Sequence, residues 1–412
     1  MFKKNSRLYY LCNIHAAMSI MGYWLLLSVL GLVLNQTSSV MSVVYEMLQL
    51  ALAIFVILSC WSYILEKGKS FLMFFMFFMA IYTIRMLFDM IGGPFSLILP
   101  RSVFLKDFSL RFFGVFVSLY AIIWSRRYID IELQVRLIFW MAFVSLVVIM
   151  LTLRSKGMLD SYEEDRVDVG RGVGSLAYVK IGAIEVLCAL HLLLNSKKKS
   201  LLYVVGLVLG LWATFVAGSR GGLVALVIAL GFWWIMSSRR NPLYTIVPVS
   251  VLILALMNIV PILNFLSRYF PVIGERLLYS YLENDQSGRD ALRLQAIKLI
   301  GENPIFGYSY RLNSDLTGYG SHNGILDVLL AVGIPFGGMF LYFIYIKGLI
   351  MSAKLMRYRE MFFPSVMLIF VLVASMSGSI LDKCSGYAIC IFGIVYYYYY
   401  PNIKDSKINN NK

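Results

Sequence analysis

The chain has 412 residues, of which 60% are hydrophobic and 14% charged, and its mean hydropathy is +0.76. A soluble protein of this size keeps about a quarter of its residues charged, so the composition excludes a soluble globular domain. The formal net charge of +15 is typical of the basic cytoplasmic segments of membrane proteins, and we expect no nucleic-acid partner.

Hydrophobic runs recur along the whole chain, and most are at least ~18 residues long, enough to cross ~30 Å of hydrocarbon as helices. They predict an all-α, polytopic membrane protein that forms a single integral membrane domain over residues 1–412. The run after Met1-Phe2-Lys3-Lys4 is too long for a secretion signal, so we expect an uncleaved first helix. The spans, about 12 in all, are expected at 12–34, 43–65, 71–91, 108–124, 137–153, 176–194, 201–218, 221–236, 243–262, 323–346, 361–380 and 385–400.

The distribution of Lys and Arg predicts how these spans are oriented. With the amino terminus inside, more than half of the 37 Lys and Arg residues fall in the short inner segments, as is typical of cytoplasmic loops. We therefore expect both termini in the cytoplasm. Two substantial loops then lie outside, at 154–175 and 263–322, and the second carries surface helices between the ninth and tenth spans.

Five cysteines lie in or beside hydrophobic runs, without the spacing of metal ligands. They are Cys12, Cys60, Cys188, Cys384 and Cys390. We interpret them as small core residues. The acidic run 163–168 could hold a divalent cation, but a solvated loop is the simpler interpretation. We expect no metal site.

An arginine with glycines around it, Gly218-Ser219-Arg220-Gly221-Gly222, joins two short spans on the outer side. Such an arginine can simply extend to the lipid headgroups. The glycines, however, allow close approach of other backbone or of a ligand. A guanidinium held near hydrocarbon also suits bidentate binding of phosphate.

The stretch 287–301 predicts an outer helix with Arg289 and Arg293 on one face, four residues apart. Leu292, Ala296, Leu299 and Ile300 form its apolar face, so we expect it to lie on the membrane surface. The simplest interpretation is a basic interfacial helix that contacts lipid phosphates.

Ser321-His322-Asn323 precedes the tenth span at its outer boundary. His322 could merely cap that helix. It is nevertheless the only histidine expected outside, because His15 and His191 fall near inner helix ends. A neutral imidazole there could accept a proton from a sugar hydroxyl.

Several charged residues fall inside expected spans. Arg85 and Asp89 are four apart in the third span and should pair with each other. Lys180 and Glu185 in the sixth span and Asp327 in the tenth are expensive to bury in hydrocarbon, and we expect them to line a cavity.

Three stretches in this order resemble the O-antigen ligase/polymerase superfamily of bacterial surface-glycan assembly. They are Gly218-Ser219-Arg220-Gly221-Gly222, then Gly288-Arg289 leading to Asn303-Pro304-Ile305-Phe306-Gly307-Tyr308, then Ser321-His322-Asn323 leading to Gly333-Ile334-Pro335. The expected topology is similar too, with a long outer loop between the ninth and tenth spans. The resemblance covers mainly residues 200–340, and the first half of the chain resembles the family only in hydropathy.

The resemblance implies a glycosyltransferase of GT-C-like architecture in the bacterial inner membrane, with both termini cytoplasmic and the active site facing the periplasm. The implied substrate is an undecaprenyl-diphosphate-linked oligosaccharide, with no metal and no cofactor. By motif, Arg220 and Arg289 would bind the lipid diphosphate and His322 would be the catalytic base. The implied secondary site residues are Arg293, Arg171, Lys180, Asn323 and Asp327.

These roles agree with the chemistry of the residues themselves. Two arginines can stabilise the charge that grows on a leaving diphosphate without a metal. The base removes the proton from an acceptor hydroxyl as it attacks the anomeric carbon, and such a direct displacement inverts that carbon.

The superfamily contains two activities. A polymerase joins one lipid-linked repeat unit to another, and a ligase transfers the finished glycan to lipid A–core. The stretch Gly320–Asp327 resembles the polymerases more, so we expect a polymerase with the ligase as alternative. A flippase or transporter of lipid-linked sugars is a further alternative, although transporters often contain internal repeats and none is visible here. A chain-length regulator and a flippase are implied partners, besides membrane lipid.

Overall fold

The computed structural model describes residues 6–32, 38–61, 70–92, 101–155, 175–196, 200–217, 219–237, 250, 258–269, 271–283, 289–310 and 321–401. Helices account for most of these residues, and no strand occurs among them, which agrees with the predicted all-α class.

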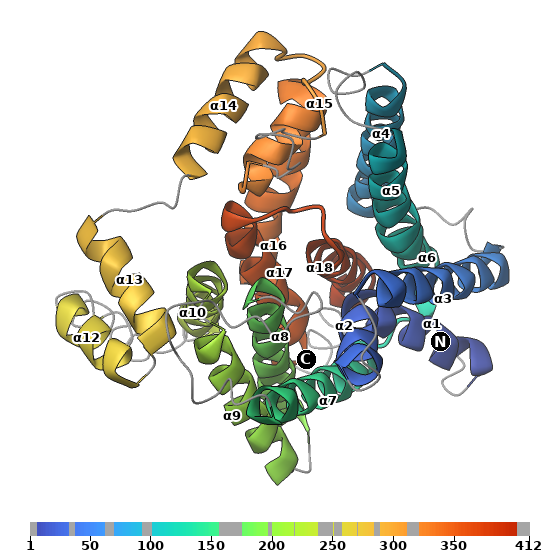
Figure 1. Ribbon diagram of the computed structural model, residues 1–412. Helices are drawn as coiled ribbons and strands as arrows, with labels where there is room; N and C mark the ends of the chain where they lie inside the picture. The colour runs from blue at the N-terminus through green and yellow to red at the C-terminus, as the bar shows by residue number, and fades with distance from the viewer. Residues whose placement is uncertain are drawn as a thin grey trace, which may run out of the picture.

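The α-helices are named as in Figure 1. They are α1 (Arg7–Ala17), α2 (Tyr23–Leu26), α3 (Ser38–Ser59), α4 (Ser70–Gly92), α5 (Arg101–Arg111), α6 (Val117–Trp124), α7 (Ile131–Ser155), α8 (Ser175–Asn195), α9 (Leu201–Val216), α10 (Arg220–Ser237), α12 (Ile259–Tyr269), α13 (Pro271–Glu283), α14 (Arg289–Glu302), α15 (Gly324–Leu341), α16 (Gly348–Leu355), α17 (Phe362–Ala374) and α18 (Lys383–Ile394). Short π-helical and 3₁₀ segments continue several of them, and those used below are η6 (Tyr342–Lys347), η7 (Arg359–Met361), η8 (Ser375–Ser377) and η9 (Val395–Tyr399).

In the described part of the chain, 8 helices are long and apolar enough to cross a membrane. They are Arg7–Leu30, Val40–Ser59, Ser70–Gly92, Ile131–Ser155, Leu176–Asn195, Arg220–Ser237, Gly324–Leu355 and Arg359–Ser377. Each coincides with an expected span, so the chain has the character of a multi-pass membrane protein.

The remaining expected spans have different outcomes. The fourth and seventh correspond to shorter apolar helices, Phe108–Trp124 and Leu201–Val216. The last, 385–400, overlaps α18 and η9. The ninth, 243–262, lies almost wholly outside the described residues. The total of about 12 spans therefore stays a prediction.

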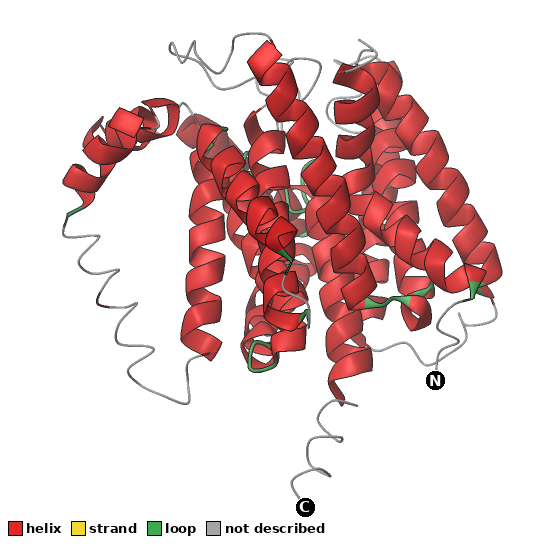
Figure 2. Cartoon of the chain, turned by 90° about the horizontal axis from the view of Figure 1, so that it is seen from below, coloured by secondary structure: helices red, strands yellow, loops and turns green. Residues whose placement is uncertain are grey.

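The helices stand side by side in a bundle (Figure 2). Its centre contains α8 and α17, because 78% of the apolar stretch in Leu176–Asn195 and 72% of that in Arg359–Ser377 is buried inside the protein. By contrast, α12, α13 and α14 follow one another along one edge of the molecule, at the left of Figure 1.

Residues that meet at one cavity define one end of the bundle. Tyr9 of α1, Asp130 just before α7, Asn195 of α8 and Tyr399 of η9 line the same space. The chain thus begins α1 and completes η9 at this end, which we call the Tyr9 end.

A second cavity defines the opposite end. Its lining includes Lys180 near the start of α8 and Lys383 at the start of α18, the two helices whose other ends reach the Tyr9 end. Ser379 also lines it, and Gly324 at the start of α15 packs against the neighbouring Ile380. We call this the His322 end.

The segment that follows α14 packs against a break in α15. Gly333 has φ 76° and ψ 175°, a conformation open to glycine, and Pro335 follows it inside the helix. The break exposes backbone groups that need partners. Ile334 donates its N–H to the carbonyl of Pro304 at 2.7 Å, and Tyr308 donates to Leu330 at 2.7 Å. These two hydrogen bonds pair backbone groups at the break in this membrane helix, where the backbone is irregular.

The apolar face of α14 is covered by protein. Ala296 and Ile300 form a small core with Leu330 of α15, and Leu292 and Leu299 pack against it. This face therefore packs against α15, whose leucine-rich surface removes the same apolar area from water, and the expected position of the helix on the membrane surface stays a prediction.

Candidate functional site

His322 lies in a tightly held turn at the start of α15. Ser321 donates both its backbone N–H, at 2.9 Å, and its hydroxyl, at 2.8 Å, to Oδ1 of Asp327. The N-cap of α15 is Asn323, whose side-chain oxygen accepts from the N–H groups of Ile325 and Leu326. His322 is thus not the helix cap, because Asn323 holds that position.

The backbone of His322 is unusual among the described residues that are not glycine, because its φ is 54°. A left-handed conformation costs a side chain with a Cβ roughly 1–2 kcal/mol. Residues are held in such conformations when the surrounding structure compensates, and they concentrate at functional sites. Here the bonds from Ser321 to Asp327 hold the turn in place.

The start of α10 carries Arg220, which is half-buried. A Cβ on Gly221 would lie 2.4 Å from the hydroxyl of Ser377, and one on Gly222 would lie 2.6 Å from Val179 of α8. These two glycines therefore allow the start of α10 to pack closely between α8 and η8, as expected from the glycines around the arginine.

The His322 turn reaches the same segment. A Cβ on Gly324 would lie 2.8 Å from the backbone nitrogen of Ile380 and 3.1 Å from the carbonyl of Gly378. The residues between α17 and α18 thus touch both the start of α10 and the start of α15. Two motifs about a hundred residues apart in sequence consequently meet around one turn.

Lys180 lies directly after Val179, in the same corner of the bundle. Its ammonium is paired with the carboxylate of Asp382, and both side chains are about a quarter exposed. Asp382 in turn caps α18 by accepting from the N–H of Ser385 at 2.7 Å. The expectation that Lys180 lines a cavity is met, since both residues of this pair line the one described next.

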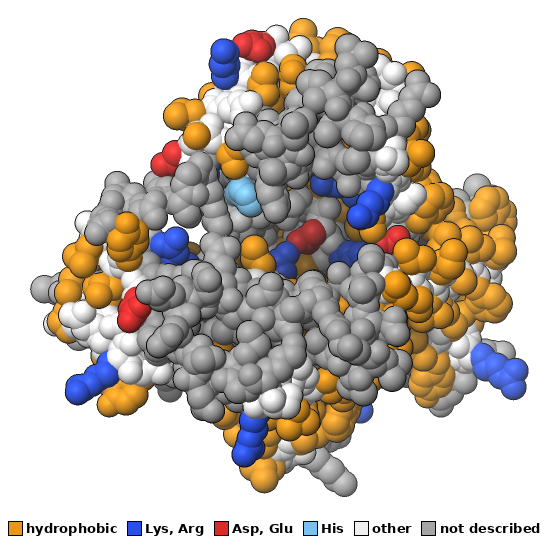
Figure 3. All heavy atoms as spheres, viewed as in Figure 1, with side chains coloured by type: hydrophobic (Ala, Val, Ile, Leu, Met, Phe, Trp, Pro, Cys, Tyr) orange, Lys and Arg blue, Asp and Glu red, His pale blue; other side chains and the backbone are white. Residues whose placement is uncertain are grey.

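That cavity has a volume of about 460 Å³ and lies at the His322 end. Its polar lining includes Glu46, Arg111, Lys180, Asp382 and Lys383. Tyr23 and Trp24 supply aromatic faces. A hollow in the face of the molecule seen in Figure 3 is surrounded by basic and acidic side chains, with a histidine at its rim. The combination of both charge signs with aromatic rings suits a charged, hydroxyl-rich ligand.

Lys383, which lines this cavity, is held over two aromatic rings. Its ammonium nitrogen lies 4.0 Å from the ring centre of Tyr45 and 5.0 Å from that of Tyr23. Lys383 stands ahead of the expected span 385–400. Burial lowers the pKa of its ammonium to about 8, although the Glu46 carboxylate acts in the opposite direction. Its charge can therefore change within a readily tested pH range.

Arg111 connects the cavity to the His322 turn. It lines the cavity, and like His322 it lies within electrostatic reach of the Asp327 carboxylate. One guanidinium nitrogen of Arg111 donates to the hydroxyl of Tyr82 at 3.0 Å, and the group also lies over the ring of Tyr310. Asp327 is thus a link between Arg111, His322 and Ser321.

The predicted pair in the third span is present, with a nitrogen of Arg85 2.7 Å from Oδ1 of Asp89. The other carboxylate oxygen of Asp89 accepts from the hydroxyl of Ser309 and from the N–H of Tyr310, both at 2.8 Å. This buried carboxylate therefore ties the segment after α14 to α4, next to Arg111.

The structure describes the other predicted arginines only in part. Arg289 begins α14, but the structure does not describe its side chain. Arg171 lies outside the described residues. Arg293 is half-buried and lies 3.5 Å from Asp290, three residues earlier on the same helix. The acidic run 163–168 also falls outside the described residues. Among the residues that are described, no group of three or more His, Cys, Asp and Glu side chains could hold a metal ion.

Arg111, Glu46, Asp382 and Lys383 were not singled out in the sequence. No local pattern marks them, because Glu46 lies within α3, Arg111 ends α5, and Asp382 with Lys383 begins α18, so that they meet only in the folded chain. One signal was available: charged residues at the outer ends of apolar spans are costly unless they face protein or water.

Residues 205–343 match the family model described as O-antigen ligase. The matched segment contains all three motifs, from Arg220 to Pro335, so the resemblance to the O-antigen ligase/polymerase superfamily is confirmed over this part of the chain. Members of that family are glycosyltransferase-like enzymes. The comparisons with curated proteins and with solved structures find no match. The residues that line the charged cavity all lie outside the matched segment.

Proposed function

We propose that the protein is an O-antigen, or surface-polysaccharide, polymerase that joins undecaprenyl-diphosphate-linked repeat units. One observation carries the proposal. The start of α10, which carries Arg220, and the turn that carries His322 both belong to the matched segment. They converge on the residues between α17 and α18, beside a charged cavity of about 460 Å³.

The reaction assigned to this site is a single displacement. The acceptor hydroxyl attacks the anomeric carbon of the donor, its proton passes to the imidazole of His322, and the bond to the lipid diphosphate breaks with its electron pair. Arg220 and Arg289 bind the diphosphate and stabilise the charge that it gains. The guanidinium fork suits two phosphate oxygens at once. Arg293 and Arg171 serve as further contacts to the anionic donor.

The cavity holds the sugar of the acceptor unit in this proposal. Glu46 and Asp382 can accept hydrogen bonds from sugar hydroxyls, Lys383 can donate to them, and Trp24 offers an apolar ring face. Arg111 links the cavity to Asp327 and so to the turn that carries His322. Asn323 and Asp327 act by fixing that turn rather than by touching substrate.

The proposed orientation places the His322 end in the periplasm and both termini in the cytoplasm of a bacterial inner membrane. It is supported by the basic inner segments and by the position of the first helix start and the last helix end, which both lie at the Tyr9 end. The total of about 12 spans and the GT-C-like architecture belong to the same proposal.

The second candidate is an O-antigen ligase, which uses the same donor and transfers the glycan to lipid A–core. The description of the matching family favours it, because that description names the ligase. Both enzymes need the same base and the same diphosphate contacts, so the acceptor alone distinguishes them.

Deletion of the gene, followed by electrophoresis of the lipopolysaccharide, tests the assignment. A polymerase predicts core carrying a single repeat unit in the mutant, and a ligase predicts bare core. The purified protein should also lengthen lipid-linked repeat units in detergent without an added metal or nucleotide sugar. A deletion strain with an unchanged ladder, together with no bond formation in detergent, would refute both enzymes.

A further inference from the structure

The cavity at the Tyr9 end is the second polar space in the described bundle, and the proposed reaction does not use it. Its volume is about 470 Å³. It lies between the start of α7, the end of α8, η7 and η9, with Tyr9 of α1 on its wall. His191 and Lys180 are both on α8, and their separation of eleven positions corresponds to roughly 16 Å along the helix. The cavity is therefore separate from the site at the His322 end.

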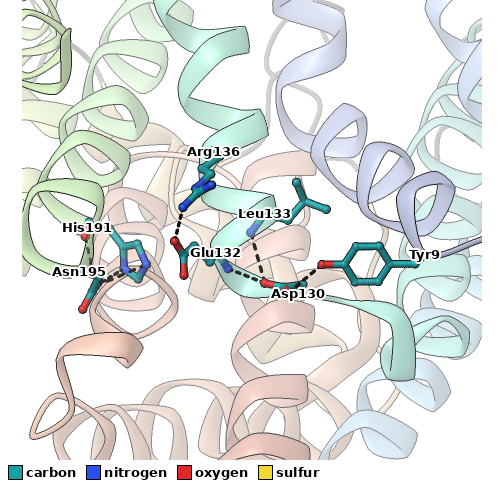
Figure 4. A network of polar contacts seen from close by, with 7 residues as sticks. All are labelled: Tyr9, Asp130, Glu132, Leu133, Arg136, His191 and Asn195. Carbon is teal, nitrogen blue, oxygen red and sulfur yellow. Dashed lines mark hydrogen bonds and ion pairs between the residues drawn. The ribbon is translucent and has the colours of Figure 1, made fainter. Parts of the chain in front are cut away.

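A hydrogen-bond network fixes two walls of this cavity (Figure 4). On one wall the hydroxyl of Tyr9 donates to Asp130 at 2.8 Å, and Asp130 caps α7 by accepting from the N–H groups of Glu132 and Leu133. On the other wall Asn195 donates to the backbone carbonyl of Arg359 at 3.0 Å. Asn195 also contacts His191. The walls are thus preorganised before any ligand binds.

The charges in the lining have both signs. Two arginines, Arg127 and Arg359, face three carboxylates, Asp130, Glu132 and Glu360. A simple anion would meet the carboxylates as well as the arginines, and a simple cation would meet the arginines as well as the carboxylates. A molecule with one anionic and one cationic group matches this lining better than either.

Arg359 and Glu360 are the side chains best suited to meet such a molecule. They are neighbours in η7, both are exposed, and within the described part of the chain neither takes part in an ion pair. Glu132, by contrast, is already paired with Arg136 at 2.5 Å. Adjacent side chains of opposite charge can contact adjacent groups of opposite charge on one ligand.

The depth of the cavity points to a lipid. The apolar stretches Arg7–Leu30, Ile131–Ser155 and Arg359–Ser377 begin at this end of the bundle, and Leu176–Asn195 ends there. Tyr399 on the wall belongs to a run of tyrosines, the residues that favour the interface between hydrocarbon and water. The cavity therefore lies at the depth of lipid headgroups.

We propose that this cavity binds the headgroup of phosphatidylethanolamine, a phospholipid that carries a phosphate and a primary ammonium. The guanidinium of Arg359, with Arg127 beside it, binds the phosphate through charge-assisted hydrogen bonds. Glu360 accepts from the ammonium, which has three N–H donors. A choline headgroup has no N–H to donate, and a glycerol headgroup has no positive charge, so both should bind more weakly.

Native mass spectrometry of the purified full-length protein tests the proposal. The probes are phosphatidylethanolamine, phosphatidylcholine and phosphatidylglycerol of the same acyl chains, each titrated in the same detergent. We expect the ethanolamine lipid to bind at least about tenfold more tightly than the choline lipid, since a hydrogen bond to a charged group is at stake. Glu360→Gln should remove that preference, and Arg359→Gln should weaken both lipids.

Two control variants make these results specific. Arg357→Gln removes an exposed basic side chain near the same end that does not line the cavity, and Glu302→Gln removes an exposed carboxylate on α14. Both should bind the ethanolamine lipid like the unchanged protein. A stronger response to phosphatidylglycerol, or equal losses in Arg357→Gln and Arg359→Gln, would refute the headgroup assignment. Binding of soluble O-phosphoethanolamine at the same affinity would show a site for free solute rather than for lipid, and would also overturn it.

Discussion

Ser321 donates two hydrogen bonds to a single oxygen of Asp327, one from its backbone N–H at 2.9 Å and one from its hydroxyl at 2.8 Å. The pair closes a short ring across the first turn of α15. His322 stands inside that ring with φ 54°. The turn that carries His322 is therefore held by a carboxylate five residues later, and Asp327 acts on the site through geometry.

The first prediction separates positioning by Asp327 from catalysis by it. Asp327→Asn keeps an oxygen that can accept from Ser321, whereas Asp327→Ala removes it. We expect the alanine variant to lose about 10–100-fold in turnover through misplacement of His322, and the asparagine variant to recover most of it. Turnover by the purified variants at equal abundance checks this. If both variants were equally inactive, Asp327 itself would become the candidate base.

The second prediction concerns the shape of the cation at Arg220. Arg220→Lys keeps the charge but loses the planar fork that contacts two phosphate oxygens. We expect about tenfold weaker binding of the lipid-linked donor, or more, with normal insertion into the membrane. Arg357→Lys, an exposed arginine near the Tyr9 end, is the matched control and should be unaffected. Equal donor binding by the Arg220→Lys and unchanged proteins would exclude Arg220 as a diphosphate ligand.

The hydropathy and charge patterns predicted the membrane character and most helices. A helix that crosses a membrane needs a long apolar run, and such a run is visible in one continuous stretch of sequence. The pair Arg85 and Asp89 was also predictable, since helix geometry alone brings residues four apart together. Span 361–380 likewise corresponds to the apolar helix Arg359–Ser377, and its last residues with those that follow form the turn on which the two motifs converge.

The cavity could not be predicted in the same way. Lys383 faces Tyr23 and Tyr45, which come from the opposite end of the sequence, and no periodicity connects them. Arg111 is likewise related to Asp327 only through the packing of separate helices. Single charged residues that come together only in the folded chain leave no spacing pattern in the sequence. A capping residue such as Asn323, or a glycine that permits close packing, can instead be recognised from its sequence neighbours.

The third prediction uses the pKa of Lys383. Burial lowers that pKa to about 8, so the ammonium loses its proton as the pH rises through this value. Turnover should consequently decline on the alkaline side near pH 8 if the charge contributes to acceptor binding. Lys383→Arg should move that decline to higher pH, because a guanidinium stays protonated, and Lys383→Met should lower activity on both sides. An alkaline limb that is identical in Lys383→Arg and the unchanged protein would contradict a role for this ammonium.

The fourth prediction tests orientation by labelling. The five native cysteines are buried and free, so a new surface cysteine can be read against a low background. The exposed Gln295 of α14, within the expected outer loop 263–322, serves as the probe. Gln295→Cys should react with an impermeant thiol reagent once the outer membrane is permeabilised. Arg357→Cys should react only after the inner membrane is broken. The reverse pattern would place the His322 end in the cytoplasm and remove the proposed reaction from the periplasm.

The last prediction is that His322 is the general base, and its backbone conformation makes an unusually clean test possible. At φ 54° an alanine would be as strained as the histidine, whereas glycine relieves the strain and asparagine tolerates it. His322→Asn should therefore fold with little change in stability, and His322→Gly should be more stable by up to about 1 kcal/mol.

Both should lose roughly 10²–10⁴-fold in turnover, because neither can take the proton from the acceptor hydroxyl. Donor binding should persist in both, since the arginines hold the diphosphate. In the unchanged protein, turnover should fall on acidification, because a protonated imidazole cannot take the proton of the acceptor hydroxyl, and this limb should be absent from the residual activity of the variants. Melting temperature, donor binding and turnover measured on one preparation decide the matter. If His322→Asn turned over normally, the base would have to be sought at Asp327 or at the exposed Glu275 of α13. If it failed only because donor no longer bound, His322 would be a substrate contact.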